Sequence, residues 1–534
     1  MTSYYLGVDV GTGSARAGVF DAKGAMLASA KRDIAMWHAA GGIVEQSSGN
    51  IWQAVCESVR EAVATAGIDP ALVAGIGYDA TCSLVVLGDG GTPLAVGPSN
   101  DPQRDIIVWM DHRATDQAER INATGAKVLA YVGGTISPEM ETPKLLWLKE
   151  NKPETFAAAW QFFDLTDFLT WKSCGSLARS ACTVTCKWTY LSHEKRWDDV
   201  YFRAVGLGQL ADEGFQRVGT DVCAGGEKLG TLSTEAAAEL GLKPGIAIAA
   251  GLIDAHAGGI GTVGARGGEG DVLSRMAYVF GTSACTMTTT ETPVFVDGVW
   301  GPYFSAMVPG LWLNEGGQSA AGAAIDHLIH MHPFAAEAER QAAAEGKGLA
   351  DSLAWQVEAR GGAAKTAEIV GGIHVVPEFL GNRAPFADPD ARAIIAGLDL
   401  DAGIDSLTGL YLAGLCGLGY GARQIVEAQK AKGIVTAVIV VSGGAARSDL
   451  VRQVLADTTG LVIAASTSPE PVLLGSAMLG AVAGGAYPDL GSAMHAMSEL
   501  GAVNRPDAGR VKWHDRRFAA FELLQATARK IRTM

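Results

Sequence analysis

The chain has 534 residues, too many for one hydrophobic core, and we expect about two to four domains. Its residues are 48% hydrophobic and 19% charged, which indicates a well-packed globular protein. The formal net charge of −15 argues against nucleic acid or an anionic membrane as a partner, because the overall field repels polyanions. An anionic ligand such as ATP therefore needs local help from backbone amides, a metal ion and a few cations.

Targeting signals are not expected. The N-terminus lacks a basic leader and Asp9 interrupts the first apolar run, which argues against a signal peptide. The most apolar segment, residues 245–264, carries Asp254 and His256 and is broken by glycines, so we do not expect it to span a membrane. Eight cysteines with no Cys-x-x-Cys pair favour a reduced, cytoplasmic setting. Three of them are expected to be buried thiols, namely Cys174, Cys182 and Cys186.

Two short apolar strands within residues 4–21 are the first predicted elements, and a turn of Gly, Thr, Gly and Ser joins them. In that turn Gly11 and Gly13 permit backbone conformations closed to larger residues and let a phosphate approach the amides. Asp9 ends the first strand, where a carboxylate is placed to hold a hydrated Mg²⁺, and Arg16 opens the return strand. An ordinary hairpin with a glycine-rich turn explains the same residues, since such turns are common in hairpins.

Strands and helices alternate over the rest of the first half. The residues at 79–82, Asp-Ala-Thr-Cys, form a polar strand end of the kind that faces ligands in open α/β sheets. Further strands are expected over 25–34, 72–78, 83–87 and 245–252, and helices are expected to begin near 48, 144 and 164.

Residues 276–287 repeat the opening pattern of an apolar strand, a Gly-Thr-Ser turn and a β-rich return. The repeat predicts two similar domains with a boundary near 255–265. We assign residues 1–257 to the N-terminal domain and residues 258–534 to the C-terminal domain.

The second half contains a third glycine-rich turn. A helix is expected over 406–432 and a strand over 436–441, and Gly-Gly-Ala follows at 443–445 before a helix that begins near Ser448. Three places where backbone amides converge are about what ATP needs for its phosphates and adenosine. This organisation predicts an α/β fold of the actin, hexokinase and heat-shock ATPase type (ribonuclease H-like), with nucleotide in a cleft between two domains.

Three other patterns have less specific interpretations. The strict phosphate-loop pattern does not occur in the sequence, which excludes a P-loop enzyme. Gly-x-Gly-x-x-Gly at 259–264 lacks the acidic residue that a dinucleotide site requires about twenty positions on, so we interpret it as helix–strand packing. His327, His330 and His332 suggest a metal site or the polar end of a helix. The helix end is favoured because no Cys or carboxylate cluster accompanies them.

Six segments resemble, in family order over nearly the whole chain, the motifs of the FGGY carbohydrate kinases. They are the first phosphate motif at 9–16, the Trp-x-Asp-x-Arg segment at 109–114, the catalytic loop at 251–254, the substrate and nucleotide loop at 315–319, the segment at 380–389 and the adenosine motif at 442–457. One departure is Asn382, which replaces the acid usual in the fifth segment. The resemblance implies the two-domain fold above and ATP-dependent phosphorylation of a sugar hydroxyl.

Residues 81–85 are similar to the segment that marks D-ribulokinases within the family. Where glycerol kinases carry an Arg-Glu pair this chain has Ala80 and Thr81, and the Met-His pair of xylulokinases is also missing. The resemblance thus implies phosphorylation of D-ribulose to D-ribulose 5-phosphate. Ribitol stays open as an acceptor, as do L-ribulose, xylulose and glycerol. A regulator that binds sugar or nucleotide without transferring phosphate is the alternative from a different class.

The resemblance also implies a set of site residues. Asp254 is the expected catalytic base, which orients the sugar hydroxyl and takes its proton late. Asp111 is expected either to bind sugar or to brace the pocket through Arg113. The full set of expected sugar contacts is Ala80, Thr81, Asp111, Lys187, Asp254 and Glu315. The expected nucleotide contacts are Gly11, Thr12, Gly13, Ser14, Arg16, Gly281, Thr282, Ser283, Gln318, Gly443, Gly444 and Ala445.

The implied ligands are ATP, Mg²⁺ and a small sugar or polyol. Mg²⁺ is expected to bridge phosphate oxygens and to reach Asp9 through water. Closure of the two domains is expected to exclude water and so to suppress ATP hydrolysis. A homodimer is a further expectation by analogy with the family.

Overall fold

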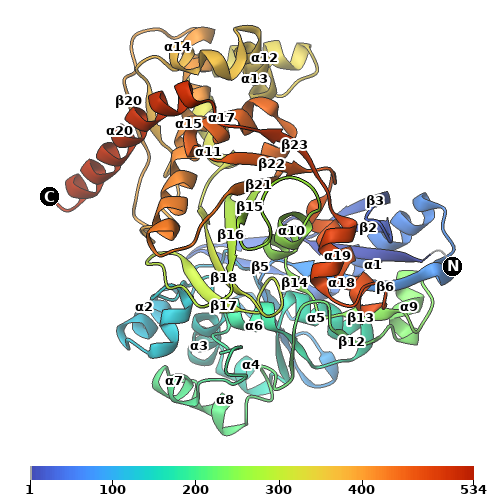
Figure 1. The fold of residues 1–534 in the computed structure, drawn as a ribbon. Helices are drawn as coiled ribbons and strands as arrows, with labels where there is room; N and C mark the ends of the chain where they lie inside the picture. Colours follow the sequence, from blue (N-terminus) through green and yellow to red (C-terminus); the bar gives the residue numbers. More distant parts are fainter. Residues whose placement is uncertain (1–2) are drawn as a thin grey trace.

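Two seven-stranded sheets, one in each half of the chain, form the framework of the computed structural model, which describes residues 3–534 (Figure 1). We call the part built on each sheet a lobe. The first sheet has the order β12 (Lys228–Thr231), β13 (Ala247–Ala249), β6 (Val73–Ala80), β1 (Tyr4–Val10), β2 (Ser14–Asp21), β3 (Met26–Asp33), with β14 (Leu252–Ile253) also paired to β6. The second sheet has the order β17 (Trp300–Phe304), β18 (Trp312–Gln318), β16 (Ala284–Thr290), β15 (Arg275–Phe280), β21 (Val438–Gly443), β22 (Val462–Ser466), β23 (Leu500–Asn504).

The predicted opening hairpin and its repeat are both present. Strand β1 pairs antiparallel with β2 and parallel with β6, and this central position explains why its residues 5–10 are all buried and mostly apolar. In the turn, the backbone N–H of Gly11 donates to Ser14 O at 3.0 Å. The repeat closes its turn with a similar bond that spans one residue fewer, from Gly281 N–H to Ser283 O at 2.9 Å. The two lobes therefore share a strand–turn–strand unit.

Helix α1 (Ser48–Ala66) begins at the predicted position near residue 48. The Ser47 side chain accepts a hydrogen bond from the backbone N–H of Asn50, which satisfies one free donor at the helix start. Gly67 ends the helix in the left-handed region at φ +64°, which costs a glycine little. The apolar face of α1 packs on β2 and β3 and covers one side of the first sheet.

A smaller sheet and several short helices extend the first lobe. The sheet has the order β4 (Trp37–Ala39), β5 (Ile43–Gln46), β8 (Ile106–Ile107), β7 (Leu84–Leu87), β9 (Gln161–Asp164). The helices are α2 (Thr115–Ala123), α3 (Glu141–Asn151), α4 (Pro153–Ala158), α5 (Leu165–Cys174), α6 (Ala181–Lys187), α7 (Asp199–Ala204), α8 (Gly208–Asp212) and α9 (Thr234–Leu240). Two short strands, β10 (Arg179–Ser180) and β11 (Val222–Cys223), pair with each other.

The second lobe carries most of its helices at the end far from the first lobe (Figure 1). They are α11 (Gly322–His330), α12 (Ala335–Ala344), α13 (Leu349–Ala359), α14 (Thr366–Val370), α15 (Ile404–Ala431), α17 (Asp449–Thr459) and α20 (Ala508–Arg532). The short α16 (Gly444–Arg447) follows directly after β21. Strands β19 (His374–Val376) and β20 (Ile394–Ala396) form a separate pair. Helix α19 (Leu490–Met497) packs instead near the junction of the lobes.

The strand expected over 245–252 is two strands, β13 and β14. Ile248 pairs with Ile76 of β6, whereas Leu252 pairs with Asp79, one residue out of step. One additional residue near Gly251 accounts for this shift in register. The chain packs closely there, because a Cβ on Gly251 would lie 2.4 Å from the backbone oxygen of Tyr78. The interruption directs the chain into the loop that precedes Asp254.

Helices α10 (Asp254–Val263) and α18 (Pro471–Ala483) cross each other between the two large sheets (Figure 1). Glycines allow this close approach, because a Cβ on Gly475 would lie 2.0 Å from Ala257 O. A Cβ on Gly261 would lie 2.1 Å from Pro471 O. Within the glycine pattern at 259–264, Gly261 packs against α18 and Gly264 against Met494 of α19. Gly259 instead faces Met307 and also Met287 of β16. The pattern thus serves helix–helix packing as well as the predicted helix–strand packing.

Helix α18 belongs to the second half of the sequence but packs on the first sheet. A Cβ on Gly75 would lie 1.9 Å from Gly480 O, and one on Gly77 would lie 2.0 Å from Ser476 O. A sequence division at residue 257 places α18 with the C-terminal domain, whereas its packing partners are β1 and β6. The chain therefore passes between the lobes more than once.

The three histidines near the end of α11 make separate contacts. His330 Nδ1 lies 2.6 Å from Asp326 O, His332 Nε2 lies 3.2 Å from Ser406 Oγ, and His327 packs edge-on against Phe379. These contacts agree with the polar helix end. Among residues 3–534, no helix combines the length and the apolar character needed to cross a membrane.

Candidate active site

A cavity of about 310 Å³ is lined by residues of both lobes. The first lobe contributes the end of β1, the turn after it, the 79–82 strand end and the last residue of α6. The second lobe contributes the repeated turn and the inner face of β18. The lining residues are Asp9, Gly11, Thr12, Arg16, Thr81, Cys82, Trp109, Glu139, Lys187, Ile253, Asp254, Ala255, Val279, Gly281, Thr282, Ser283, Cys285, Trp300, Glu315, Arg383 and Val472.

The two glycine-rich turns meet at this cavity. Gly11 and Thr12 line it from the first lobe, and 281–283 line it from the second. The space in which a side chain at Gly13 would begin is open, with no atom within 4 Å. Trp109 fixes the first turn, since its Nε1–H donates to Thr12 Oγ1 at 3.0 Å. The paired turns therefore present backbone amides to one space, an arrangement suited to phosphate groups.

Asp254 stands at the junction of β14 and α10 and lines the same cavity. Its Oδ1 accepts a hydrogen bond from the Ala255 N–H at 2.7 Å, which orients the carboxylate. Burial and the neighbouring charge of Asp9 raise the pKa of Asp254 to about 6, against smaller opposing effects from that hydrogen bond, His256 and Lys187. The carboxylate is therefore mainly ionised at pH 7, yet basic enough to accept a proton.

Two further carboxylates, those of Asp9 and Asp79, lie near Asp254. Asp9 and Asp79 are directly paired across β1 and β6, and Arg16 forms ion pairs with Asp9 and with Glu470. Burial, followed by the charge of Asp9, raises the pKa of Asp79 well above its usual value.

This carboxylate group fits a hard cation. One oxygen of Asp79, Oδ1, is buried and has no hydrogen-bond partner among the described residues. The cluster thus holds more acid than Arg16 balances, and carboxylate oxygens are the donors that Mg²⁺ prefers. Asp9, the residue predicted to reach the metal, lines the cavity. Asp79 was noted in the sequence only as part of a polar strand end.

Lys187 and Glu315 face the cavity from opposite lobes. Lys187 ends α6 and its ammonium lies 4.5 Å from the centre of the Trp300 ring. Although burial opposes its charged form, nearby Cys82 and Glu315 raise the pKa of Lys187 well above its usual value. Although burial opposes ionisation of Glu315, Lys187 and a hydrogen bond from His256 hold its pKa at about 2. The cavity therefore contains a fixed cation beside a fixed carboxylate.

Glu139 and Arg383 line the cavity and were not singled out by sequence reasoning. Arg383 reaches Cys285 Sγ at 3.5 Å, and its guanidinium lies 5.6 Å from the centre of the Trp300 ring. Burial opposes ionisation of Glu139, but a hydrogen bond from His112 and the charge of Arg383 lower its pKa. Arg383 stands inside the 380–389 motif, so position in a motif was a usable signal. Glu139 belongs to none of the quoted motifs.

Several predicted contacts do not line the cavity. Ala80 is fully buried in β6 next to Thr81, which does line it. Asp111 is buried and accepts hydrogen bonds from Arg113 and from the backbone N–H of Val44. These bonds correspond to the bracing alternative, in which Asp111 acts through Arg113. Gln318 is likewise occupied, because it accepts from Tyr278 Oη–H and donates to Leu418 O.

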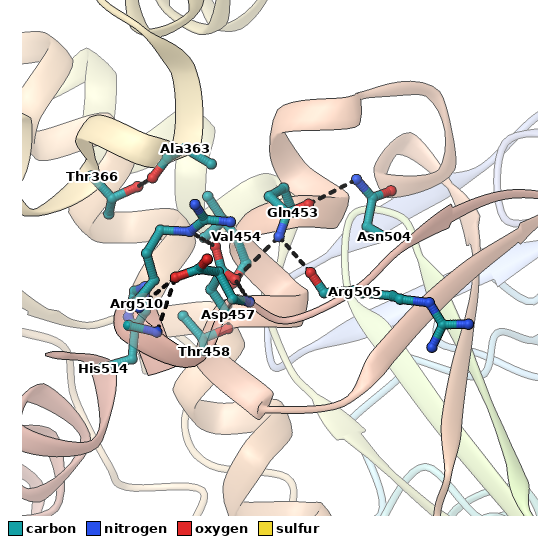
Figure 2. A network of polar contacts seen from close by, with 12 residues as sticks. Ala363, Thr366, Gln453, Val454, Asp457, Thr458, Asn504, Arg505, Arg510 and His514 are labelled. Atoms are coloured by element: carbon teal, nitrogen blue, oxygen red, sulfur yellow. Dashed lines mark hydrogen bonds and ion pairs between the residues drawn. The ribbon is translucent and has the colours of Figure 1, made fainter. Parts of the chain in front are cut away.

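The adenosine motif divides into an exposed turn and a buried brace. Gly443 and Gly444 are exposed, and Gly443 pairs with Phe280, the residue before the second phosphate turn. Further along, Gln453 donates to Asp457 Oδ1 at 3.1 Å, and Arg510 pairs with Asp457 Oδ2 at 2.6 Å (Figure 2). These side chains hold α17 against α20, so the exposed Gly443 and Gly444 are the part of the motif accessible to a ligand, whereas Ala445 is buried.

Comparison with known proteins identifies the family. Residues 4–261 match the FGGY family of carbohydrate kinases, N-terminal domain, and residues 276–484 match its C-terminal domain. The chain belongs to the FGGY family of carbohydrate kinases. It is thus a phosphotransferase that uses ATP, rather than the non-catalytic regulator left open by the sequence.

Relatives of this FGGY kinase extend over nearly its whole length. A human protein named FGGY carbohydrate kinase domain-containing protein is 45% identical over 527 residues, 97% of this chain and 95% of the relative. A Saccharomyces cerevisiae protein named D-ribulokinase is 38% identical over 512 residues, 90% of this chain and 72% of the relative. The solved structure of a Rhodospirillum rubrum xylulose kinase, 22% identical, covers 99% of both chains with a TM-score of 0.81. This last likeness shows that the two-lobed fold is shared.

Proposed function

We propose that this FGGY kinase transfers the γ-phosphoryl group of ATP to the terminal hydroxyl of D-ribulose, giving D-ribulose 5-phosphate. The observation that carries the proposal is the position of Asp254, in one cavity with Lys187 and Glu315 and with the two glycine-rich turns. The choice of D-ribulose is supported by the 38% identity to the yeast protein named D-ribulokinase.

Asp254 positions the terminal hydroxyl and removes its proton. Phosphoryl transfer has a loose transition state with little early nucleophilic demand, so orientation of the hydroxyl contributes more than early deprotonation. Asp254 therefore accepts the proton late, and a pKa of about 6 leaves it ionised yet basic at neutral pH. The hydrogen bond from the Ala255 N–H holds the carboxylate toward the cavity.

Lys187 and Glu315 bind the sugar hydroxyls in complementary ways. The ammonium of Lys187 donates hydrogen bonds, and the ionised carboxylate of Glu315 accepts them. The short side chains of Thr81 and Cys82 form the wall where a bulkier charged pair would shorten the pocket. This wall leaves room for a five-carbon acceptor.

The phosphates lie between the two turns in this proposal. The amides after Gly11 and those at 281–283 bind the β- and γ-phosphates from opposite sides, and the exposed Gly443 and Gly444, with the buried Ala445 behind them, receive the nucleoside. Bound near Asp9 and Asp79, Mg²⁺ supplies charge neutralisation for the phosphate oxygens. In terms of the expected division, the part up to residue 257 supplies the first phosphate turn and most of the sugar contacts. The part after it supplies the second phosphate turn, the nucleoside turn and the sugar contact Glu315.

The direct test compares acceptors at matched concentrations. ADP release is measured with D-ribulose, ribitol, L-ribulose, D-xylulose and glycerol, with saturating ATP and Mg²⁺. We expect D-ribulose to give a kcat/KM at least tenfold above every other acceptor. A higher kcat/KM for ribitol would indicate that the acceptor is this polyol and not the ketose D-ribulose. Preference for glycerol or D-xylulose would overturn the proposed substrate class.

A further inference from the structure

The strongest feature outside the phosphoryl-transfer residues is a buried cluster of Cys182, Cys186 and His256. Their ligand atoms, two Sγ and one imidazole nitrogen, all lie within 4.8 Å of one another. Sγ of Cys182 is 2.9 Å from Nδ1 of His256. The three side chains are fully buried, and they come from α6 and from α10.

We propose that Cys182, Cys186 and His256 form a binding site for a thiophilic metal ion of the Zn²⁺ class, directly behind the sugar-binding face of the cavity. Two thiolates and one imidazole are the donors that structural and catalytic zinc sites use. Hard cations such as Mg²⁺ prefer oxygen donors and octahedral geometry, so this cluster is expected to bind Zn²⁺-class ions and not Mg²⁺.

The spacing of the cysteines favours a metal over a disulfide. Cys182 and Cys186 stand four residues apart on α6, where Cβ atoms on a helix face lie about 5–6 Å from each other. A disulfide needs a Cβ–Cβ separation of about 3.5–4.5 Å, so forming one would distort the helix. A metal ion between two sulfur atoms bridges the wider gap, and two ligands four residues apart on one helix are a recurring zinc arrangement.

The surroundings of His256 match those of a metal-bound imidazole. Its Nε2 lies 3.2 Å from Glu315 Oε2, which leaves Nδ1 directed at the sulfur atoms. Metal-ligating histidines commonly donate their other N–H to a carboxylate, which fixes the tautomer and strengthens the ligand. Glu315 therefore serves the metal site through His256 and the sugar through its free side.

Metal binding requires the thiolate form of each cysteine and a free lone pair on His256 Nδ1. Protons carried by these atoms in the metal-free protein are therefore released when the ion binds. Small shifts of α6 against α10 accommodate the longer sulfur–nitrogen separation of about 3.5 Å that follows from zinc bond lengths.

Metal binding to the whole protein tests the proposal without reference to kinase activity. The metal-free chain is titrated with Co²⁺, and the thiolate-to-cobalt charge-transfer absorption is recorded; Zn²⁺ is then added as a competitor. We expect one Co²⁺ per chain, displaced by one Zn²⁺ and unaffected by excess Mg²⁺. Absence of the charge-transfer band in the wild-type chain, or its loss on adding Mg²⁺, would overturn the site.

Two variants and a matched control assign the ligands. Cys182→Ser and Cys186→Ser are expected to weaken Zn²⁺ binding at least tenfold, whereas Cys223→Ser removes a half-buried thiol elsewhere and should leave it unchanged. Circular dichroism checks that each variant is folded. If a cluster variant unfolds, the wild-type chain decides the matter through a rise in Tm on adding Zn²⁺, since a ligand bound only by the native state stabilises it. Equal binding by all three variants would overturn the assignment.

Discussion

The carboxylate of Asp254 lies where burial and the charge of Asp9 both oppose its ionisation. His256 and Lys187 oppose that effect from α10 and α6, and the pKa of Asp254 settles at about 6. A base must be ionised to accept a proton, so protonation of Asp254 inactivates it as pH falls through this value. We expect kcat/KM for the sugar to be level above pH 7 and to fall about tenfold per pH unit below pH 5. A profile that stays flat down to pH 5 would contradict the assignment.

Replacement of the same carboxylate tests its role more directly. Asp254→Asn keeps the size of the side chain and removes its basicity, so kcat should fall at least 10²-fold, a typical contribution of a positioned general base. Nucleotide affinity should be retained, because the glycine-rich turns are unchanged. Asp297→Asn is the matched control, since that carboxylate is fully exposed. Near-normal turnover in Asp254→Asn would reject Asp254 as the base.

Substitution of Lys187 is expected to affect sugar binding but not nucleotide binding. In the proposed complex, each charged hydrogen bond from Lys187 to a sugar hydroxyl is worth about 1.5–3 kcal/mol, which corresponds to roughly 10- to 150-fold in affinity. Lys187→Met should therefore raise the KM for D-ribulose at least tenfold and leave the KM for ATP within about twofold. Steady-state kinetics with each substrate varied in turn measures this, and Lys243→Met at an exposed position is the control. Equal increases in both KM values would indicate a general structural defect.

Three of the expected sugar contacts line one cavity. Asp254 and Glu315 stand in quoted motifs, whereas Lys187 stands in none and was implied by the family resemblance alone. Asp111 also lies in a motif, but its carboxylate accepts hydrogen bonds from Arg113. The sequence does not show which partner a buried acid will have, because that depends on the three-dimensional structure. Glu139 was missed because a single glutamate forms no local pattern. Its place in the cavity and its low pKa depend on His112 and Arg383, which are distant in the sequence.

At the scale of elements, apolar periodicity predicted the opening hairpin, its repeat and α15 close to their observed bounds. These signals are local, since each follows from side-chain alternation or helix caps within a few residues. The one-residue shift between β13 and β14 was missed because it depends on pairing with β6. The packing of α18 on the first sheet was missed for the same reason, since no local pattern within residues 471–483 indicates which element the helix contacts.

The crossing of α10 and α18 gives a prediction at this scale. Gly475→Ala places a Cβ 2.0 Å from the backbone oxygen of Ala257, which cannot move without displacing α10. We expect overpacking to cost about 1–3 kcal/mol, seen as a lower Tm and a lower denaturant midpoint. Gly372→Ala is the control, because its added Cβ meets no atom within 4 Å. An unchanged midpoint in Gly475→Ala would show that the crossing is looser than described.

At the scale of the whole molecule, the cavity depends on both lobes. The first lobe supplies Asp9, Lys187 and Asp254, and the second supplies Thr282, Glu315 and Arg383. Phosphate and sugar ligands therefore gain contacts from both sides only when the lobes are close together. Helices α10 and α18 connect the sheets by close backbone contact, so relative motion of the lobes is expected to occur about this crossing.

This arrangement predicts ligand-driven closure with a consequence for ATP. A non-hydrolysable ATP analogue with Mg²⁺ and D-ribulose should reduce the radius of gyration in solution scattering, from a starting value of about 24 Å expected for a compact chain of this length. Either ligand alone should give a smaller decrease, because each reaches fewer residues of the opposite lobe. Closure excludes water from the γ-phosphate, so ATP hydrolysis without sugar should run at under a hundredth of the kinase rate. A radius unchanged by both ligands together, or a fast sugar-independent hydrolysis, would contradict closure as the device that directs phosphate to the sugar.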